Sequence, residues 1–223
     1  MAGPRSAVIA IAEESGLIAE IGAWVLWQAR MAATGWNGVA VHVNVAAYQL
    51  AQTNLVDDIE AALNTTGLDP AMLVVEITES AVVPDVGQGR IQKLNVLGIQ
   101  IGIDDFGMGY SSLARLRWVP AHILKIDKLL VENLVTSEED RAILRAIHDL
   151  ATAMGMQVVA EGVETTDQLA VLTKIGFTKA QGYYWSPPYP RTRCRRWLRG
   201  WWCVSSWRLS LVTRTHNSLR MSD

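Results

Sequence analysis

Short β-rich runs alternate with amphipathic helical stretches along most of the 223 residues, and this alternation constrains the fold more than any other feature. The predicted strands are residues 39–46, 72–78, 99–105, 122–127, 156–163 and 178–182. The helices predicted between them include 55–66, 88–97, 138–154 and 166–175, and they stop at glycines expected as C-caps, namely Gly67, Gly98, Gly155 and Gly176. Because the strands are apolar on both faces, the pattern indicates a parallel α/β sheet covered by helices.

The number of strand–helix units indicates which α/β fold this is. Six units without the glycine-rich turn of dinucleotide-binding proteins favour an incomplete TIM-type (β/α) barrel over a doubly wound sheet. A complete barrel has eight units, so we expect about six of the eight here, preceded by a helix at 18–32. The prediction is therefore one domain at residues 1–190, truncated at its N-terminus.

The last part of the chain has a different composition. Residues 191–223 hold 8 Arg against the single Asp223, whereas residues 1–190 hold 12 Lys and Arg against 21 Asp and Glu. Four tryptophans fall within eleven residues, at Trp197, Trp201, Trp202 and Trp207. A basic aromatic segment of this kind can bind nucleic acid or a membrane surface. The abrupt change in composition favours instead an extension outside the fold, without strands or capped helices, and no nucleic-acid polymer is expected as a partner.

No apolar run approaches the roughly 18 residues that a membrane-spanning helix needs. The apolar stretch at residues 7–12 is short and runs straight into Glu13 and Glu14, unlike a secretory signal. We therefore expect a cytoplasmic protein that reaches a membrane only through flanking domains outside this sequence.

Each predicted strand ends in a polar or ionisable residue. These residues are Asn44, Glu76, Asp104 with Asp105, Lys125, Glu161 and Gln181. In α/β barrels the carboxyl ends of the strands are where catalytic groups gather. Strand-end carboxylates can also simply cap the next helix, which is the better interpretation for Asp127, Glu164 and Glu79 taken singly. Six aligned strand ends favour a functional site.

A cluster of carboxylates needs a positive charge, because buried carboxylates are costly unless they are paired or bind a metal. Oxygen ligands from Asp, Glu and Asn suit Mg²⁺ or Mn²⁺, and no His or Cys is expected beside them, which argues against zinc. The adjacent Asp104 and Asp105 indicate a two-metal site of the kind that supports in-line displacement at phosphorus. With Lys125 as a fixed positive charge, the residues predict metal-dependent phosphoester hydrolysis and leave the substrate open.

Five motifs follow one another in an order that resembles one known family. They are Val-Glu-Ile-Thr-Glu-Ser from Val75, Asp-Asp-Phe-Gly from Asp104, Lys-Ile-Asp from Lys125, Ala-Glu-Gly-Val-Glu from Ala160 and Gln-Gly-Tyr from Gln181. Together they resemble the EAL domain of cyclic di-GMP phosphodiesterases, over residues 12–188. The resemblance implies a modified TIM-type barrel, opening of cyclic di-GMP to linear pGpG, and Mg²⁺ or Mn²⁺ at a two-metal site.

The resemblance also implies roles for individual residues. The implied metal ligands are Asn44, Glu76, Asp104, Asp105 and Glu161. Lys125 would contact the attacking water and the phosphate, and Glu161 and Gln181 would complete the metal and water shell. Glu79 resembles a glutamate that steadies the loop after Asp-Asp-Phe-Gly, and the Asp105–Ser112 loop is implied to couple the site to homodimerisation.

Four departures from the family pattern bear on activity. The sequence contains no Glu-Ala-Leu segment, whose glutamate is a metal ligand in the family. Met108 and Tyr48 stand where the family more often has a small or hydroxyl residue and an arginine, and the Arg/Trp-rich segment replaces an acidic helix. Two functions therefore stay open: a metal-dependent phosphodiesterase whose activity in this chain is doubtful, or a non-catalytic cyclic di-GMP-binding or regulatory module. A barrel enzyme acting on another phosphoester explains the strand ends but not the ordered motifs.

Overall fold

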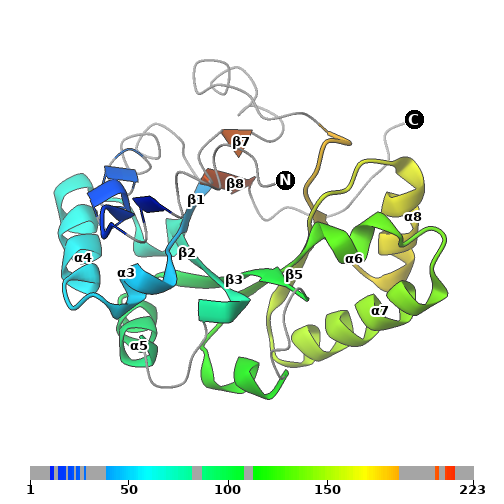
Figure 1. Cartoon of the computed structure of the whole chain (residues 1–223), viewed down its shortest axis with the longest axis horizontal. Coiled ribbons are helices and arrows are strands. Elements are labelled where there is room, and N and C mark those ends of the chain that lie inside the picture. Colours follow the sequence, from blue (N-terminus) through cyan, green and yellow to red (C-terminus); the bar gives the residue numbers. More distant parts are fainter. Residues whose placement is uncertain are drawn as a thin grey trace.

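The computed structural model describes residues 11–12, 15–18, 20–22, 24–25, 28, 39–81, 87–107, 113–185, 204–205 and 209–213. Their centre is a curved sheet with helices along its outer side (Figure 1). The parallel strands of this sheet are β1 (Val39–Asn44), β2 (Leu73–Thr78), β3 (Gln100–Phe106), β4 (Ile123–Ile126), β5 (Gln157–Ala160) and β6 (Lys179–Ala180). Each is paired with the next in chain order, from β1 to β6.

Burial on both faces is typical of the strands of a parallel sheet, and β2 shows it. In β2, five consecutive residues from Leu73 to Ile77 are buried, and Thr78 is half-buried. Such a strand cannot place one face in water, so helices must cover the sheet on the other side. The pairing sets Asn44 opposite Glu76 and Glu76 opposite Gly102, which brings the polar strand ends to one edge.

Helices connect the strands and cover the outside of the curve. They are α3 (Ala47–Ala51), α4 (Leu55–Thr66), α5 (Gln88–Val96), α6 (Lys128–Glu132), α7 (Glu138–Ala153) and α8 (Thr166–Ile175). Three short 3-10 helices span Pro70–Met72, Glu79–Ala81 and Leu113–Trp118. Figure 1 shows α4 and α5 beside the first strands and α7 and α8 beside the last ones.

Local sequence signals define where these helices begin and end. Thr165 and Gln168 form a capping box at the start of α8, and Gly176 ends the helix with φ 117°. Ser137 caps α7, whose first turn is acidic and so complements the helix dipole. Apolar side chains on the inner faces of the helices then pack against the sheet to form one core, which includes Ile59, Leu94, Ile101, Leu144 and Leu172.

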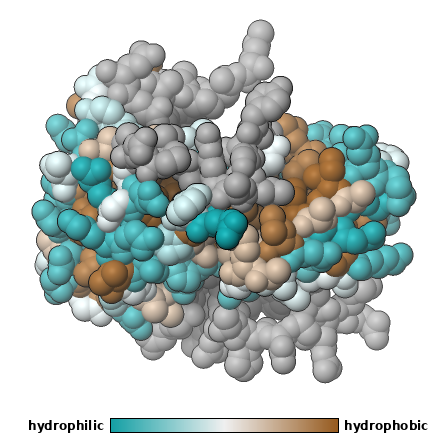
Figure 2. Space-filling model, turned by 90° about the horizontal axis from the view of Figure 1, so that it is seen from below, coloured by the Kyte–Doolittle hydropathy of each residue, from teal (hydrophilic) through white to brown (hydrophobic). Residues whose placement is uncertain are grey.

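On the side seen from below, the described surface shows patches of hydrophobic residues among hydrophilic ones (Figure 2). Large exposed apolar side chains of the described residues include Val96, Trp118 and Ile143. Among the helices that the structure describes, none is both long enough and apolar enough to cross a membrane.

The expected fold class, an incomplete (β/α) barrel with six parallel strands, is confirmed. One difference lies at the first edge of the sheet, where β8 (Leu209–Thr213) pairs antiparallel with β1 and also with β7 (Val204–Ser205). Strands were not expected in the Arg/Trp-rich segment, and the domain boundary at residue 190 stays a prediction. Of the predicted helix at 18–32, the described residues 18, 20–22, 24–25 and 28 are helical, and the others lie outside the described residues.

Candidate functional site at the strand ends

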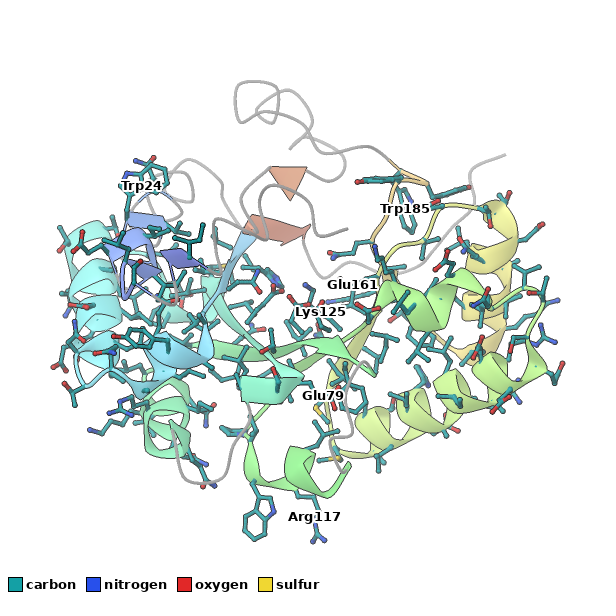
Figure 3. The ribbon with its side chains drawn as sticks, viewed as in Figure 1. Trp24, Glu79, Arg117, Lys125, Glu161 and Trp185 are labelled. Atoms are coloured by element: carbon teal, nitrogen blue, oxygen red, sulfur yellow. The ribbon has the colours of Figure 1, made fainter. Side chains whose placement is uncertain are left out.

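Lys125 is the centre of the candidate site. It lies in β4, its side chain is 3% exposed, and its Nζ contacts carboxylate oxygens of three residues. The distances are 2.8 Å to Asp104 Oδ1, 3.2 Å to Glu76 Oε2 and 2.5 Å to Glu161 Oε1. Figure 3 shows Lys125 and Glu161 together on the inner side of the curved sheet. One buried cation thus joins carboxylates from β2, β3 and the end of β5.

The charge of Lys125 is set by two opposing effects. Burial alone would lower the pKa of its ammonium group, but the charges of Glu76, Glu161 and Asp104 outweigh burial and raise the pKa above its usual value. The lysine therefore stays protonated across the physiological pH range. It provides a permanent positive charge at the carboxyl end of the sheet.

Glu76 is fully buried, and each of its oxygens has a cationic or hydrogen-bonding partner. His42 Nδ1 lies 2.7 Å from Glu76 Oε1, while Lys125 Nζ lies 3.2 Å from Oε2. Burial acts to raise the pKa of Glu76, but the His42 hydrogen bond and the Lys125 charge together lower it below its ordinary value. Glu76 is therefore an ionised carboxylate held at both oxygens.

Glu161 follows β5 and carries the opposite shift. Gln181 donates a hydrogen bond of 2.7 Å from Nε2 to Glu161 Oε1, the same oxygen that Lys125 contacts. Burial raises the pKa of Glu161 to about 7, against the charge of Lys125, and the negative charges of Asp104 and Glu76 add to the rise. Burial thus favours the neutral form of Glu161 although Lys125 is its direct partner.

Asp104 and Asp105 both reach the site although they are adjacent in a strand. Neighbouring strand residues normally point to opposite faces. Here the β3–β4 register shifts between Ile103 and Phe106, and Asp105 adopts φ 55°, a left-handed conformation that Asp tolerates better than most residues. One carboxylate oxygen from each of Asp104, Asp105 and Glu161 lies within 4.8 Å of the others.

This oxygen set fits a divalent cation. Three carboxylates, from Glu76, Asp104 and Glu161, contact a single lysine, and Asp105 lies beside Asp104 and Glu161. Several carboxylate oxygens close together are the ligands that Mg²⁺ and Mn²⁺ prefer. The residues present can therefore hold a hard cation.

The predicted site residues lie at different distances from this centre. The structure brings Glu76, Asp104, Asp105, Lys125, Glu161 and Gln181 together. Asn44 is half-buried at the end of β1, opposite Glu76 in the register.

Glu79 is buried in the turn after β2 and accepts a 2.9 Å hydrogen bond from the Gly107 backbone N–H, at the start of the loop it was expected to steady. Residues 108–112 of that loop, including Met108, lie outside the described residues.

One residue of the site was missed from the sequence. No histidine was expected beside the carboxylates, yet His42 contacts Glu76, so this expectation was wrong. The available signal was its position two residues before Asn44, because residues two apart in a strand face the same side. Of the carboxylates assigned singly to helix capping, Asp127 does cap α6, where its Oδ1 accepts a hydrogen bond from the Leu129 backbone N–H.

A curved parallel sheet with a lysine-centred carboxylate site at its strand ends defines a barrel-type protein with a site suited to a divalent cation. The sequence matches the EAL domain family over residues 2–188. This chain belongs to the EAL domain family.

Similar proteins carry names that refer to cyclic di-GMP. The chain is 40% identical over 190 residues to the bifunctional diguanylate cyclase/cyclic di-GMP phosphodiesterase MucR of Pseudomonas aeruginosa, covering 81% of this chain and 27% of that protein. It is 37% identical over 200 residues to the cyclic di-GMP phosphodiesterase NbdA of the same species, covering 86% of this chain and 26% of NbdA. The chain thus spans about a quarter of the length of the curated relatives it matches.

Solved structures share the fold. The PaMucR phosphodiesterase in complex with c-di-GMP has a TM-score of 0.79 and 37% identity, over 83% of this chain and 78% of that one. BlrP1 of Klebsiella pneumoniae, in a complex with manganese and cy-diGMP, has a TM-score of 0.68 and 28% identity, over 75% of this chain and 43% of that one.

Proposed function

We propose that this chain is a metal-dependent phosphodiesterase domain that hydrolyses cyclic di-GMP to linear pGpG. The observation that carries the proposal is the convergence of Glu76, Asp104 and Glu161 on Lys125, with Asp105 beside them. Membership of the EAL family supports the choice of substrate. The relatives named above support it as well, because their names include this activity.

The metal is proposed to be Mg²⁺ or Mn²⁺, bound at a two-metal site. The ligands of this site would be Asp104, Asp105 and Glu161, with Glu76 and Asn44 as further ligands. When bound, such ions supply an activated water and neutralise charge on the phosphate. The manganese in the BlrP1 complex supports this choice of ion.

The chain's own residues would orient and stabilise the reacting groups. The water gives up a proton as its oxygen bonds to phosphorus; the bond from phosphorus to the 3′ oxygen breaks, the 3′ oxygen takes up a proton to become a hydroxyl, and the 5′ phosphate stays on the linear product. Negative charge grows on the phosphate oxygens during this step, and the permanently charged Lys125 is placed to stabilise it. Gln181 holds Glu161 through its Nε2 hydrogen bond, so that the carboxylate stays directed toward Lys125.

Aromatic side chains beside the site support a nucleotide substrate. The turn after Gln181 carries Tyr183 and Tyr184, which are 64% and 39% exposed. Tyr184 packs edge-on against Trp185 with ring centroids 5.1 Å apart, and Figure 3 shows Trp185 on the open side beyond Glu161. Exposed rings at this position suit stacking on a guanine base.

A second candidate is a module that binds cyclic di-GMP without cleaving it. The sequence lacks the Glu-Ala-Leu segment whose glutamate is a metal ligand in the family, and this observation favours binding alone. Homodimerisation through the Asp105–Ser112 loop and a cytoplasmic location are further parts of the proposal. Homodimerisation follows from the family, and the cytoplasmic location was expected from the sequence; they are tested by the mass in solution and by cell fractionation.

The deciding experiment is to incubate the purified chain with cyclic di-GMP and Mn²⁺ or Mg²⁺ and to measure pGpG by chromatography. Turnover that disappears in Glu76→Gln and Lys125→Met, but not in the exposed-site control Glu164→Gln, would support the phosphodiesterase. Absence of turnover together with calorimetric binding of the nucleotide would favour the binding module. Absence of both turnover and binding would contradict both candidates.

A further inference from the structure

His42 lies on β1 among buried residues and faces the candidate site. Its side chain is 1% exposed, and its Nδ1 lies 2.7 Å from Glu76 Oε1. Residues 42 and 44 of a strand point to the same face, so His42 and Asn44 belong to the same side of the sheet. A buried imidazole needs a hydrogen-bonding partner, and here that partner is a carboxylate of the site.

The two oxygens of Glu76 have different neighbours. Oε1 faces His42, and Oε2 lies 3.2 Å from Lys125 Nζ. An ionised carboxylate only accepts hydrogen bonds, so the His42 ring must carry its proton on Nδ1 for this contact to be a bond. The Nδ1–H then holds one oxygen and leaves the other turned toward Lys125.

We propose that His42 is a positioning residue for Glu76: its Nδ1–H holds Oε1, which fixes the carboxylate with Oε2 toward Lys125 and the cation site. This role rests on the proposed metal-dependent function, although the hydrogen bond itself does not. Without the imidazole, the carboxylate could rotate and offer both oxygens to Lys125. The tighter ion pair would compete with a divalent cation for Glu76.

The effect expected on cation binding follows from similar arrangements. Partners that orient a metal-binding carboxylate typically change metal affinity by about 10–100-fold when they are removed. Asn places its Nδ2 near the position of the histidine Nδ1, so His42→Asn keeps the donor. His42→Leu keeps much of the volume and removes the donor.

His122 provides a matched control elsewhere in the same sheet. It immediately precedes β4, where its Nδ1 accepts a 3.1 Å hydrogen bond from the Ile101 backbone N–H. That contact lies at the amino end of the strand, away from the carboxylates at the other end. His122→Leu therefore removes a histidine contact to the sheet without touching Glu76.

The test measures Mn²⁺ binding to the full chain by calorimetry, without nucleotide, alongside thermal melts that confirm folding. We expect His42→Leu to weaken Mn²⁺ binding by about 10–100-fold. His42→Asn should stay within about 3-fold of the wild type, and His122→Leu should not differ from it. Wild-type affinity in His42→Leu would overturn the proposal. Equal loss in His42→Leu and His42→Asn would also overturn it, because it would point to a direct ligand or to packing.

A second measurement is independent of the metal. Nitrogen NMR of the metal-free chain reports which ring nitrogen of His42 carries the proton, and we expect Nδ1. Protonation on Nε2 alone would overturn the proposal. If the wild type carries the proton on Nδ1 but binds no Mn²⁺, the hydrogen bond between His42 and Glu76 is supported. In that case the role of His42 in positioning Glu76 toward a cation and the proposed metal-dependent function are both overturned.

Discussion

Glu76 and Glu161 both contact Lys125, yet their pKa values shift in opposite directions. The pKa of Glu76 is lowered despite complete burial, whereas the pKa of Glu161 is raised to about 7. Glu76 has His42 on one oxygen and Lys125 on the other. Glu161 presents a single oxygen to both Lys125 and Gln181, and it lies near the negative charges of Asp104 and Glu76.

The difference shows that a shared cation does not fix the charge of a carboxylate. What decides it is the balance between burial, the donors on each oxygen and the neighbouring acids. At Glu76 this balance favours the ionised form, and at Glu161 it opposes it. The carboxylate oxygens that lie close enough to share a divalent cation are those of Asp104, Asp105 and Glu161.

Removing the shared cation should have the largest effect. Lys125→Met leaves the buried Glu76 and Asp104 and the half-buried Glu161 without their common partner, and loss of one partner of a buried ion pair typically costs about 3–5 kcal/mol. We expect this loss in the free energy of unfolding at pH 8, measured with urea in EDTA. The loss should shrink at pH 5, because protonated carboxyl groups are easier to bury. A variant as stable as the wild type at pH 8 would contradict the central role of Lys125.

The two glutamates should respond differently to pH in metal-free protein. The pKa of Glu161 rises from 4.5 to about 7 on folding, so between these pH values the folded chain keeps a proton that the unfolded chain has lost. This contribution to stability is present below pH 4.5 and is lost as the pH rises through about 7. At 1.36 kcal/mol per pKa unit, it amounts to about 3 kcal/mol.

Comparing Glu161→Gln with Glu76→Gln at pH 5 and pH 8 tests this contrast. The wild type should lose stability relative to Glu161→Gln as the pH rises. Glu76 has a lowered pKa, so its contribution is present above pH 4.5 and lost only in more acidic solution. Glu76→Gln should therefore be less stable than the wild type by a similar amount at pH 5 and pH 8. Parallel pH profiles for both variants would refute the assignment.

Adding a divalent cation should reduce the contrast between the two sides of the site. At a Mn²⁺ concentration of about 100 times the dissociation constant, binding should stabilise the wild type by about 2.7 kcal/mol. Glu161→Gln and Asp104→Asn should lose most of this gain, because each removes an oxygen donor from the acidic cluster. Thermal melts with and without Mn²⁺ measure the effect, with Glu164→Gln as an exposed control. An equal gain in all four proteins would place the ion elsewhere.

The smallest effect is expected at a glutamate whose partner is the backbone. Glu79 Oε2 accepts a hydrogen bond from the Gly107 N–H, and Glu79→Gln keeps an acceptor but removes its charge. We expect a loss of about 1 kcal/mol in the free energy of unfolding. Faster hydrogen exchange at the Gly107 amide should accompany it. Unchanged exchange at Gly107 would show that Glu79 does not hold the loop.

Much of the fold could be predicted because its signals are local. Helices α4 and α8 were predicted with the bounds that the structure has, since a 3.6-residue apolar period and C-capping glycines mark them. The six parallel strands were predicted within a few residues. The pairing of β8 with β1 was not predicted. Residues of the basic, Trp-rich segment form this antiparallel strand because an edge of the sheet is available for pairing, and their own sequence pattern does not indicate a strand.

The sequence by itself determined which strands carry polar ends, because alternation and residue type are written along the chain. It also placed Glu76, Asp104, Lys125 and Glu161 at one edge, since parallel strands bring their carboxyl ends together. Only the tertiary structure decided that Lys125 joins three of the carboxylates, that His42 holds Glu76, and that Glu161 titrates near neutral pH. These properties depend on distances of a few ångströms and on burial, which arise only when distant strands pack together.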